Sequence, residues 1–443
     1  MFNKINKIIL IFAAAIFTFI LHLPSAMAYG GSDNLRVGIV YSSNAVNEYT
    51  LGSSSGFIAG TEENRVFTEG MAIDSSTIKI TVDSDGIITY GDETFDTNSG
   101  QRLTIMSAGD NLLTLNGKEH RGGLEFLNAG NGKLSVVNLI SVNDYVKGVV
   151  PGEIPSSWHE EALKAQAVCA RNYSVANKDK HESGGFDVCT TIHCQVYGGV
   201  AAETERTNKA VDATAGQYLM YNGSLAQTLF FSSAGGHTGN AKYVWGNDIP
   251  YLRGVDNDFE NPSDNPRYTW SKTLTTEEIE QKLAANGYAI GSVKGITSKT
   301  DEVTGQVYEL TIHGTADSKT YKNDNTRGCF GSDVLLSQFY TVTPVTTPAA
   351  TGISAITSTG KSLLADYYVL SGMGEKTTIQ FPFVAKSALA QMTLCPQALA
   401  YRFDGRGWGH GLGMSQYGAK GMADQGYTYD QILAHYYPGT VLK

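Results

Sequence analysis

The chain has 443 residues and a formal net charge of −10, from 33 Lys and Arg against 43 Asp and Glu. This acidic balance argues against nucleic acid as a ligand, since phosphate backbones are bound by clusters of positive charge. With 42% hydrophobic and 17% charged residues, a chain of this length is expected to build two or three domains with apolar cores.

The N-terminus is typical of a secretory signal peptide. Lys4 and Lys7 precede an apolar run over residues 8–21, and the small residues of Ser25–Ala28 form a cleavage site. We expect residues 1–28 to be removed, which takes away two lysines and no acids and changes the net charge from −10 to −12. The expected location is therefore secreted and extracellular. The alternative is a membrane anchor formed by residues 8–21, although a span usually needs roughly 20 residues.

Residues 35–140 are predicted to form a small N-terminal β-rich unit. Ile78, Ile80 and Val82 alternate with polar residues, and the Asp85–Gly86 pair that follows is typical of a tight hairpin turn. No residue of this unit suggests chemistry of its own.

Glu153 lies in the most unusual segment of the chain. Pro151, Gly152 and Pro155 surround it and predict a stiff loop, because proline fixes φ while glycine permits conformations closed to other residues. Apolar neighbours would raise the pKa of its carboxyl group, which favours a general acid. The alternative is a carboxylate that caps the next helix or pairs with a lysine, and spacing alone favours that alternative.

A helix is predicted after this loop, capped by Ser156 or Ser157 and running to about Asn177. A second helix is predicted over residues 204–215, where Gly216 ends it. Both helices lie in the mixed region that carries most of the candidate chemistry.

Two basic residues share one face of the first of these helices. Lys164 and Arg171 are seven residues apart, which corresponds to two helical turns. Either side chain is a candidate to orient Glu153 or to bind substrate. For Lys164 the alternative is an ion pair with Glu160 on a solvated surface.

Later elements follow from turn and cap signals. Asn222–Gly223 predicts a hairpin, and residues 275–285 predict a helix with a capping box. Residues 341–400 are expected to be a divergent insertion or inserted strands between a catalytic region at 141–340 and a closing segment at 401–443. That segment carries a glycine-rich motif and two helices. The expected fold class is α+β and β-rich.

Four potential metal ligands are close together in the sequence. His181, Cys189, His193 and Cys194 supply two imidazoles and two thiolates, which can complete a closed tetrahedral Zn²⁺ shell of the structural type. The alternatives are a Cys189–Cys194 disulfide or two reduced thiols. The direct adjacency of His193 and Cys194 strains the four-ligand interpretation.

Two further segments are candidates for substrate binding. Ser232 and Ser233 follow a predicted strand but lack the spacing of a serine nucleophile, so they are better suited to hydrogen-bond a substrate. Trp408 and His410 lie among glycines that allow close backbone approach. Tryptophan is a natural platform for a sugar ring, and the alternative is a packing turn around a core tryptophan.

Five strings occur in an order that resembles the SpoIID/LytB family, which includes the sporulation lytic transglycosylases and related amidase enhancers. The strings are VNDYVKGVVPGEIP, EALKAQAVCARNY, FFSSAGGHTGNAKYVWG, PYLRGVD and GRGWGHGLGMSQYGAKGMA. The resemblance covers roughly residue 35 to the C-terminus.

The resemblance assigns roles to individual positions. The catalytic glutamate of the family falls on Glu153, with Ile154 in place of the usual methionine. The basic helix residues of the family fall on Lys164 and Arg171. Its serine loop falls on Ser232–Gly236, where the second serine of the motif is missing. Clostridial members carry a zinc-binding element, which here falls on His181, Cys189, His193 and Cys194.

The implied reaction is cleavage of the β-1,4 bond between N-acetylmuramic acid and N-acetylglucosamine in peptidoglycan glycan strands, with a 1,6-anhydro sugar as product. Glu153 alone would act as acid and then as base. One alternative is a non-catalytic wall-binding protein that enhances a partner cell-wall amidase. The other is a zinc hydrolase, which a closed set of four protein ligands would count against.

Overall fold

The computed structural model describes the backbone of six short strands between 354 and 394, and in addition the following ranges: 33–63, 65–109, 112–331, 333–345 and 398–443. The predicted signal peptide at 1–28 and the alternative anchor at 8–21 lie outside the described residues.

The described chain divides into two compact units. The first unit includes the residues up to Ser141 together with Ser183–Phe186, and the second includes Val142–Glu182 and Asp187–Lys443. Among the described residues, the first unit has one apolar core and the second unit has two.

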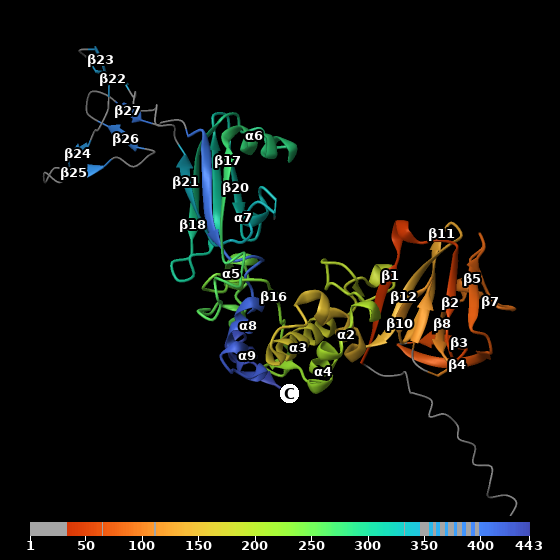
Figure 1. Ribbon diagram of the computed structural model, residues 1–443. Helices are drawn as coiled ribbons and strands as arrows, with labels where there is room; N and C mark the ends of the chain where they lie inside the picture. Colours follow the sequence, from red (N-terminus) through yellow and green to blue (C-terminus); the bar gives the residue numbers. More distant parts are fainter. Residues whose placement is uncertain are drawn as a thin grey trace, which may run out of the picture. The chain divides into compact units, whose positions relative to one another are not determined.

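Two β-sheets packed face to face make up the first unit (Figure 1). Within this unit, one sheet has the order β1 (Asn34–Val40), β12 (Lys133–Ser141), β11 (Gly123–Gly130), β8 (Arg102–Ser107), β3 (Phe57–Glu63), β4 (Val66–Ile73). The other has the order β10 (Lys118–Arg121), β9 (Leu112–Leu115), β2 (Glu48–Gly52), β5 (Thr77–Val82), β6 (Ile87–Tyr90), β7 (Glu93–Asp96). Short 3-10 turns occupy Ser42–Asn44 and Thr97–Ser99.

The alternation predicted for the first unit is confirmed. Ile78, Ile80 and Val82 are buried in the core between the two sheets, because successive side chains of a strand point to opposite faces. The hairpin about Asp85–Gly86 joins β5 to β6, which pair antiparallel from Val82 and Ile88 onward.

Helices form one part of the second unit (Figure 1). They are α2 (Val142–Glu153), α3 (Glu160–Ala176), α4 (Glu205–Ala213), α5 (Ala241–Val244), α8 (Gln416–Asp424) and α9 (Tyr429–Tyr436). Short strands accompany them: β13 (Val188–Cys189), β14 (Leu219–Tyr221), β15 (Ser224–Leu225), β16 (Phe230–Phe231), β29 (Met414–Ser415) and β30 (Val441–Leu442). Two 3-10 turns, Val200–Ala202 and Pro250–Leu252, complete this part.

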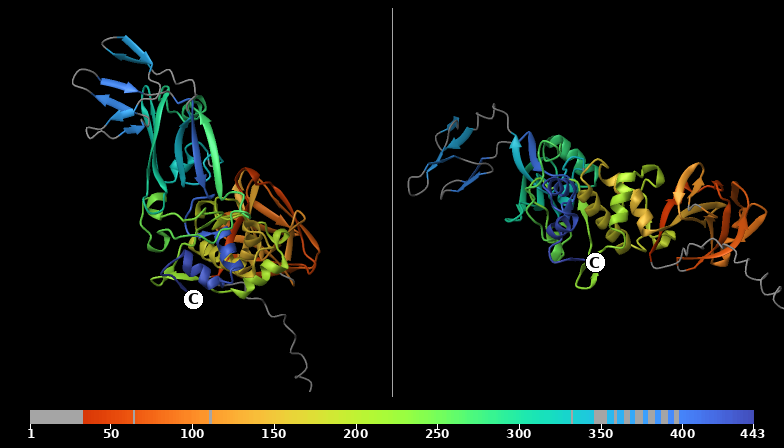
Figure 2. Two further views of the ribbon diagram at one scale, coloured as in Figure 1. Left: turned by 60° about the vertical axis from the view of Figure 1, so that its left-hand side comes forward. Right: turned by 60° about the horizontal axis from the view of Figure 1, so that its bottom comes forward.

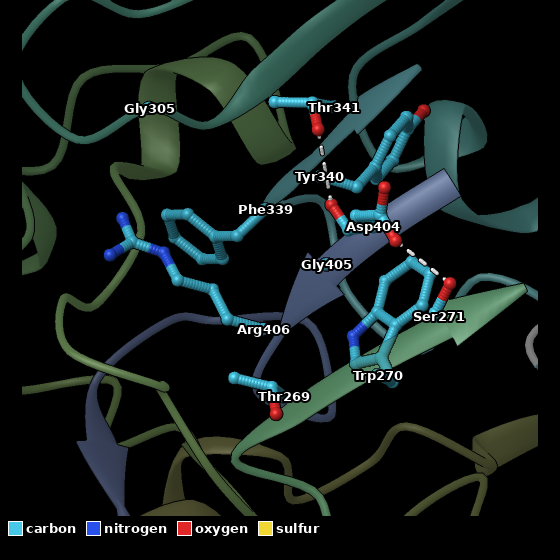
Figure 3. Close-up of a pocket in the computed structure, with 10 residues that line it drawn as sticks. All are labelled: Thr269, Trp270, Ser271, Gly305, Phe339, Tyr340, Thr341, Asp404, Gly405 and Arg406. Carbon is cyan, nitrogen blue, oxygen red and sulfur yellow. Dashed lines mark hydrogen bonds between the residues drawn. The ribbon is translucent and has the colours of Figure 1, made fainter. Parts of the chain in front are cut away.

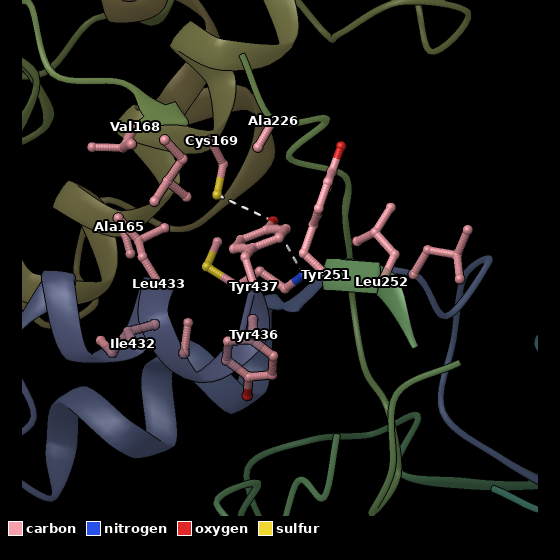
Figure 4. Close-up of a cluster of buried hydrophobic side chains, with 14 of the residues drawn as sticks. Ala165, Val168, Cys169, Ala226, Tyr251, Leu252, Ile432, Leu433, Tyr436 and Tyr437 are labelled. Carbon is pink, nitrogen blue, oxygen red and sulfur yellow. Dashed lines mark hydrogen bonds between the residues drawn. The ribbon is translucent and has the colours of Figure 1, made fainter. Parts of the chain in front are cut away.

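A shared apolar core joins helix α3 to the C-terminal helices α8 and α9 (Figure 4). Cys169 lies at its centre, with its sulfur 3.3 Å from the hydroxyl oxygen of Tyr437. Burial raises the pKa of this thiol to about 12, so Cys169 is a packed, protonated side chain. Residues far apart in the sequence therefore complete one core.

Strands form the other part of the second unit. One antiparallel sheet has the order β17 (Thr269–Thr275), β28 (Ala400–Arg406), β21 (Tyr340–Val345), and another has the order β18 (Val293–Thr300), β19 (Val307–Gly314), β20 (Ser318–Lys322). Helices α6 (Thr276–Ala285) and α7 (Asn325–Gly328) pack with these sheets around one core. Three hairpins complete the described strands: β22 (Ser354–Thr357) with β23 (Gly360–Leu363), β24 (Tyr368–Leu370) with β25 (Lys376–Thr378), β26 (Phe383–Lys386) with β27 (Gln391–Leu394).

The secondary structure confirms the α+β, β-rich fold class. Figure 2 shows strands in both units and helices concentrated in the second. Among the described residues, none of the helices combines the length and the hydropathy that crossing a membrane would require.

Two local predictions near Glu153 are wrong. The predicted stiff loop is helical, since α2 continues through Pro151 and ends at Glu153 itself. Val149 and Val150 are completely buried, and their packing outweighs the hydrogen bond that the proline removes. Neither predicted serine caps α3: His159 is the N-cap, and its Nδ1 accepts the backbone N–H of Glu161 at 3.2 Å.

Candidate functional site

Glu153 ends helix α2 with its side chain half-buried. Its Oε1 accepts the backbone N–H of Val196 at 3.1 Å, and the side chain of Gln416 also hydrogen-bonds the carboxyl group. Burial raises the pKa of this carboxyl group, although both hydrogen bonds oppose the shift. The group therefore keeps its proton to a higher pH than a free glutamate, which suits a general acid.

Two glycines of α2 allow the 196–197 segment to approach the helix closely. A Cβ atom at Gly148 would lie 2.5 Å from the ring of Tyr197, and one at Gly152 would lie 3.2 Å from Val196. Any larger side chain would push away the backbone N–H that Glu153 accepts. The glycines of the VKGVVPGEI string thus keep the backbone of Val196 within hydrogen-bond distance of Glu153.

Glutamine side chains lie beside the acid. Gln416 is the first residue of α8, and its Nε2 donates to Oε1 of Gln166 on α3 at 3.4 Å. Gln166 is completely buried, and its own Nε2 has no hydrogen-bond partner within the described part of the chain. Sequence analysis missed both residues, because no local pattern links α3 to a helix that begins 250 positions later.

Aromatic side chains lie in the segments that carry the acid and its hydrogen-bond partners. Tyr145 and Tyr197 stack with ring centroids 5.1 Å apart, and Trp158 meets Tyr417 edge-on at 5.1 Å. Tyr145 is completely buried, which raises its pKa well above the usual value, and Glu153 contributes to this shift. Apolar rings around a carboxyl group disfavour its charged form.

The structure does not place the two basic residues of α3 against the acid. Lys164 Nζ lies 2.7 Å from Glu160 and 2.9 Å from Glu161, as in the alternative of a solvated ion pair. Arg171 is buried and donates to the carbonyl of Val211 and to Oδ1 of Asn143, both at 3.1 Å. These bonds tie α3 to its neighbouring helices.

The serine loop, Ser232–Gly236, is fixed by hydrogen bonds to the buried carboxylate of Glu260. Ser233 is buried and donates its hydroxyl hydrogen to Glu260 at 2.7 Å, whereas Ser232 is half-buried. Glu260 accepts six hydrogen bonds: from Ser233 Oγ, Ala234 N, Gly235 N, Asn257 Nδ2, Asn265 Nδ2 and Ser415 Oγ. Sequence analysis missed Glu260, because its surroundings read as a polar loop.

Trp408 and His410 lie on the segment that pairs with this loop. Trp408 exchanges two backbone hydrogen bonds with Ser233, and its side chain is 37% exposed. The guanidinium of Arg267 lies 3.5 Å from the centroid of its ring. Burial lowers the pKa of His410 to about 4, and its Nδ1 accepts the N–H of Leu412 at 3.0 Å. His410 is therefore an uncharged imidazole at pH 7 whose Nδ1 accepts a hydrogen bond.

The four predicted metal ligands come together. Donor atoms of His181, Cys189, His193 and Cys194 all lie within 4.8 Å of one another, and both cysteines are free thiols. Cys194 Sγ lies 3.3 Å from His181 Nε2 and 3.8 Å from His193 Nδ1. A tetrahedral zinc ion would separate such donors by about 3.5 Å. This His/Cys group can therefore hold a metal ion, and His193 belongs to it.

Hydrogen bonds favour a thiolate in this group. Although burial opposes ionisation, bonds from Thr191, His193 and Cys194 lower the pKa of Cys189 to about 6. Burial raises the pKa of Cys194, and the neighbouring Cys189 raises it further, because a second negative charge so close to the first is unfavourable. One thiolate is thus ready to bind a cation, and the cation would release the second proton.

Comparison with known proteins gives consistent matches. A family model described as Stage II sporulation protein matches residues 130–221. Stage II sporulation protein D of Bacillus subtilis is 30% identical over 69% of this chain and 76% of its own length. An uncharacterized protein of Brachyspira hyodysenteriae is 31% identical over 74% of this chain and 73% of its own length.

The amidase enhancer of Bacillus subtilis is 29% identical over 90% of this chain but only 54% of its own length. This chain therefore spans about half of that relative. The range matched by the family model includes Glu153, both basic residues of α3 and all four members of the His/Cys group. With these matches and the site geometry together, the chain belongs to the SpoIID/LytB family.

Proposed function

We propose that this protein is a peptidoglycan lytic transglycosylase, which cleaves the β-1,4 bond between N-acetylmuramic acid and N-acetylglucosamine in glycan strands. The observation that carries this proposal is the half-buried carboxyl group of Glu153, with its raised pKa and two hydrogen bonds. Relatives named Stage II sporulation protein D and amidase enhancer support a role in sporulation or cell-wall remodelling.

One residue performs two proton transfers in the proposed reaction. Protonated Glu153 donates to the glycosidic oxygen as the bond from that oxygen to C1 of the muramoyl ring breaks. The resulting carboxylate removes the proton from the C6 hydroxyl of the same ring, and O6 attacks C1. The product is a 1,6-anhydro sugar, no water is consumed, and Glu153 ends protonated. Activity is therefore expected to fall as the pH rises through the raised pKa of Glu153.

The surrounding residues position the acid and the strand. The Val196 N–H and Gln416 fix the carboxyl group, and Arg171 holds α3 against its neighbours. Lys164 forms an ion pair with Glu160 in the first turns of α3 and adds a positive charge at that end of the helix. Trp408 would offer an exposed ring edge to a sugar, beside Ser232 and His410.

We propose a structural zinc ion in the His/Cys group. His181, Cys189, His193 and Cys194 would hold it, and four protein ligands leave no open position for a catalytic water. This argues against a zinc hydrolase. A chelator is expected to lower the melting temperature of the protein, with His193→Ala matching the chelated state. Loss of activity on chelation without any change in melting temperature would contradict a structural role.

The decisive experiment is digestion of peptide-free glycan strands, followed by mass spectrometry. The wild type should release products ending in 1,6-anhydro-N-acetylmuramic acid, and Glu153→Gln should lose about 10²–10⁴-fold in rate. Glu277→Gln, an exposed glutamate on α6, serves as the matched control and should retain full activity. Absence of anhydro products from the wild type would refute the transglycosylase.

A second candidate function is enhancement of a partner cell-wall amidase without catalysis. The amidase enhancer that matches 90% of this chain favours it. Adding wild type or Glu153→Gln to a cell-wall amidase with intact peptidoglycan separates the two. Equal enhancement by both proteins would support the binding role, whereas enhancement by the wild type alone would support the enzyme.

Secretion is part of the proposal. Residues 1–28 would direct export and then be removed, and the mature protein would bind the glycan strand outside the cell. N-terminal sequencing of the exported protein should begin after Ala28, whereas retention of residues 8–21 would indicate an anchored form.

A further inference from the structure

A stacked pair of side chains, Arg267 and Trp408, borders the serine loop. The guanidinium carbon of Arg267 lies 3.5 Å from the centroid of the Trp408 ring, which is the geometry of a close cation–π contact. Trp408 is 37% exposed and Arg267 is half-buried, so the pair lies at the surface. One face of the indole is therefore covered by a guanidinium and is not available to a sugar ring.

Hydrogen bonds fix the backbone of both members of the pair. The Arg267 N–H donates to Oδ1 of Asn265 at 3.0 Å, and Nδ2 of Asn265 donates to Oγ of Ser233 at 2.7 Å. Asn265 is only 2% exposed. The Trp408 N–H donates to the carbonyl of Ser233 at 2.7 Å. The bonds that hold the serine loop thus also hold the stacked pair, and the guanidinium is in position before any ligand binds.

The positive charge of Arg267 has no counter-ion in the part of the chain that the structure describes. No carboxylate oxygen lies within 4.0 Å of its guanidinium there, and its guanidinium donates no hydrogen bond. Asp264, the nearest acid in the sequence, pairs with Lys420 at 3.3 Å instead. In contrast, Arg253 and Arg402 each donate to a carboxylate. The planar fork of five N–H donors on Arg267 can therefore take a carboxylate from a ligand.

The neighbouring arginine, Arg406, is part of the packing of the second unit. Figure 3 shows its side chain beside the ring of Phe339, and its guanidinium carbon lies 5.4 Å from the centroid of that ring. Its Nη2 donates to the carbonyl of Thr304 at 3.0 Å. Arg406 therefore connects two segments of the fold, whereas the guanidinium of Arg267 makes no comparable bond.

The serine loop lies between the stacked pair and the acid. On one side the loop pairs with the segment of Trp408, and on the other the carbonyl of Ser232 accepts the Tyr417 N–H at 3.0 Å. Tyr417 follows Gln416, whose side chain hydrogen-bonds the carboxyl group of Glu153. Two backbone pairings of about 4.8 Å each thus separate the Trp408 segment from the start of α8. One short stretch of glycan strand can reach both the guanidinium and the acid.

We propose that Arg267 is a specificity-determining residue, which binds a carboxylate carried by the muramoyl units of the glycan strand. In a peptide-free strand the lactyl group of each muramoyl unit ends in a carboxylate, and in a peptide-bearing strand the stem peptide supplies the carboxylates. Both sources present the planar acceptor that a guanidinium binds through two parallel N–H···O bonds. The assignment rests on the proposed function, since it takes the substrate of Glu153 as ligand.

The test measures binding of three probes to the Glu153→Gln protein, which leaves the strands intact. The probes are peptide-free strands, the same strands with their lactyl carboxylates reduced to alcohols, and strands that keep their stem peptides. The parent should bind the carboxylate strand about 10–100-fold more tightly than the alcohol strand, and adding Arg267→Gln should abolish this difference. If the stem peptide is the source, Arg267→Gln should instead weaken the peptide-bearing strand alone.

Arg402→Gln is the matched control, because it removes the same charge from a side chain that is 52% exposed and already paired with Asp404; it should bind all three probes as the parent does. Arg267→Lys keeps the charge without the planar fork and should retain part of the discrimination. Unchanged affinity of Arg267→Gln for both carboxylate-bearing probes would overturn the assignment. Equal weakening of all three probes would also overturn it, since it would indicate a structural role.

Failure of this assignment and failure of the reaction are distinguishable. Release of anhydro products is measured on the protein with Glu153 intact, whereas carboxylate discrimination is measured on the Glu153→Gln protein, in which no bond is cleaved.

Discussion

Two glutamates of the second unit have opposite surroundings. Glu260 is 5% exposed and accepts six hydrogen bonds from serine hydroxyls, asparagine amides and backbone N–H groups. Glu153 is half-buried, and its carboxyl group receives one backbone N–H and one glutamine side chain. The first carboxylate has its acceptor capacity filled, whereas the second retains capacity for a ligand.

The difference separates a structural carboxylate from a reactive one. The six hydrogen bonds at Glu260 leave no lone pair free for a substrate. Glu260 therefore holds the serine loop, the 257–265 segment and Ser415 at the start of α8 in one arrangement. The sparse bonding at Glu153 permits gain and loss of a proton. Burial of a carboxyl group does not by itself identify a catalytic acid. A small number of hydrogen-bond donors to that group does.

The largest expected effect is on stability and comes from Glu260→Gln. A carboxamide would place an N–H₂ group against donors that the carboxylate satisfied, and the free energy of unfolding should fall by about 3–5 kcal/mol. Glu153→Gln should change it by less than about 1 kcal/mol. Urea unfolding of both variants measures this contrast. Equal losses of unfolding free energy in the two variants would show that both carboxylates stabilise the fold to the same extent.

Ser233→Ala should have a smaller effect. It removes a hydroxyl that donates to Glu260 and accepts from Asn265, which should cost about 1–2 kcal/mol of unfolding free energy. Ser232→Ala is the paired control and should leave stability unchanged. If Ser233→Ala instead raised the KM for glycan strands with no loss of stability, its hydroxyl would be a substrate contact.

The smallest effect is expected from Gln416→Leu. Its side chain lowers the pKa of Glu153, so its loss should move the high-pH limb of the activity profile to higher pH and change the rate several-fold, equivalent to about 1 kcal/mol. Gln416→Glu should alter the same limb, and Gln425→Leu at the exposed end of α8 should not. An unshifted limb would remove Gln416 from the positioning of the acid.

Local signals predicted much of the fold. The alternation at Ile78–Val82, the hairpin at Asn222–Gly223 and the capping box at Thr275 each depend on neighbours a few residues away, and all three are confirmed. The prediction failed at Pro151, because the burial of Val149 and Val150 is a property of the packed unit. Patterns over a few neighbouring residues do not indicate how strongly burial in the packed unit stabilises a helical turn.

The candidate site shows the same division. The four metal ligands were found because they lie within 14 residues of one another, and Glu153 because of its prolines and the family motifs. Gln166, Gln416 and Glu260 were missed, since the serine loop that Glu260 holds lies 25 to 27 positions before it and Gln166 and Gln416 are 250 positions apart. The catalytic roles of Lys164 and Arg171 stay predictions, and Ser233→Ala and Ser232→Ala address the role of the serine loop.

The C-terminal segment has a consequence for synthesis. Strand β29 pairs with β16, β30 pairs with β14, and Lys443 exchanges two backbone hydrogen bonds with Tyr218. The core around α3 therefore stays incomplete while the ribosome is still making α8 and α9. A nascent chain can therefore complete this core only after α8 and α9 have emerged from the ribosome.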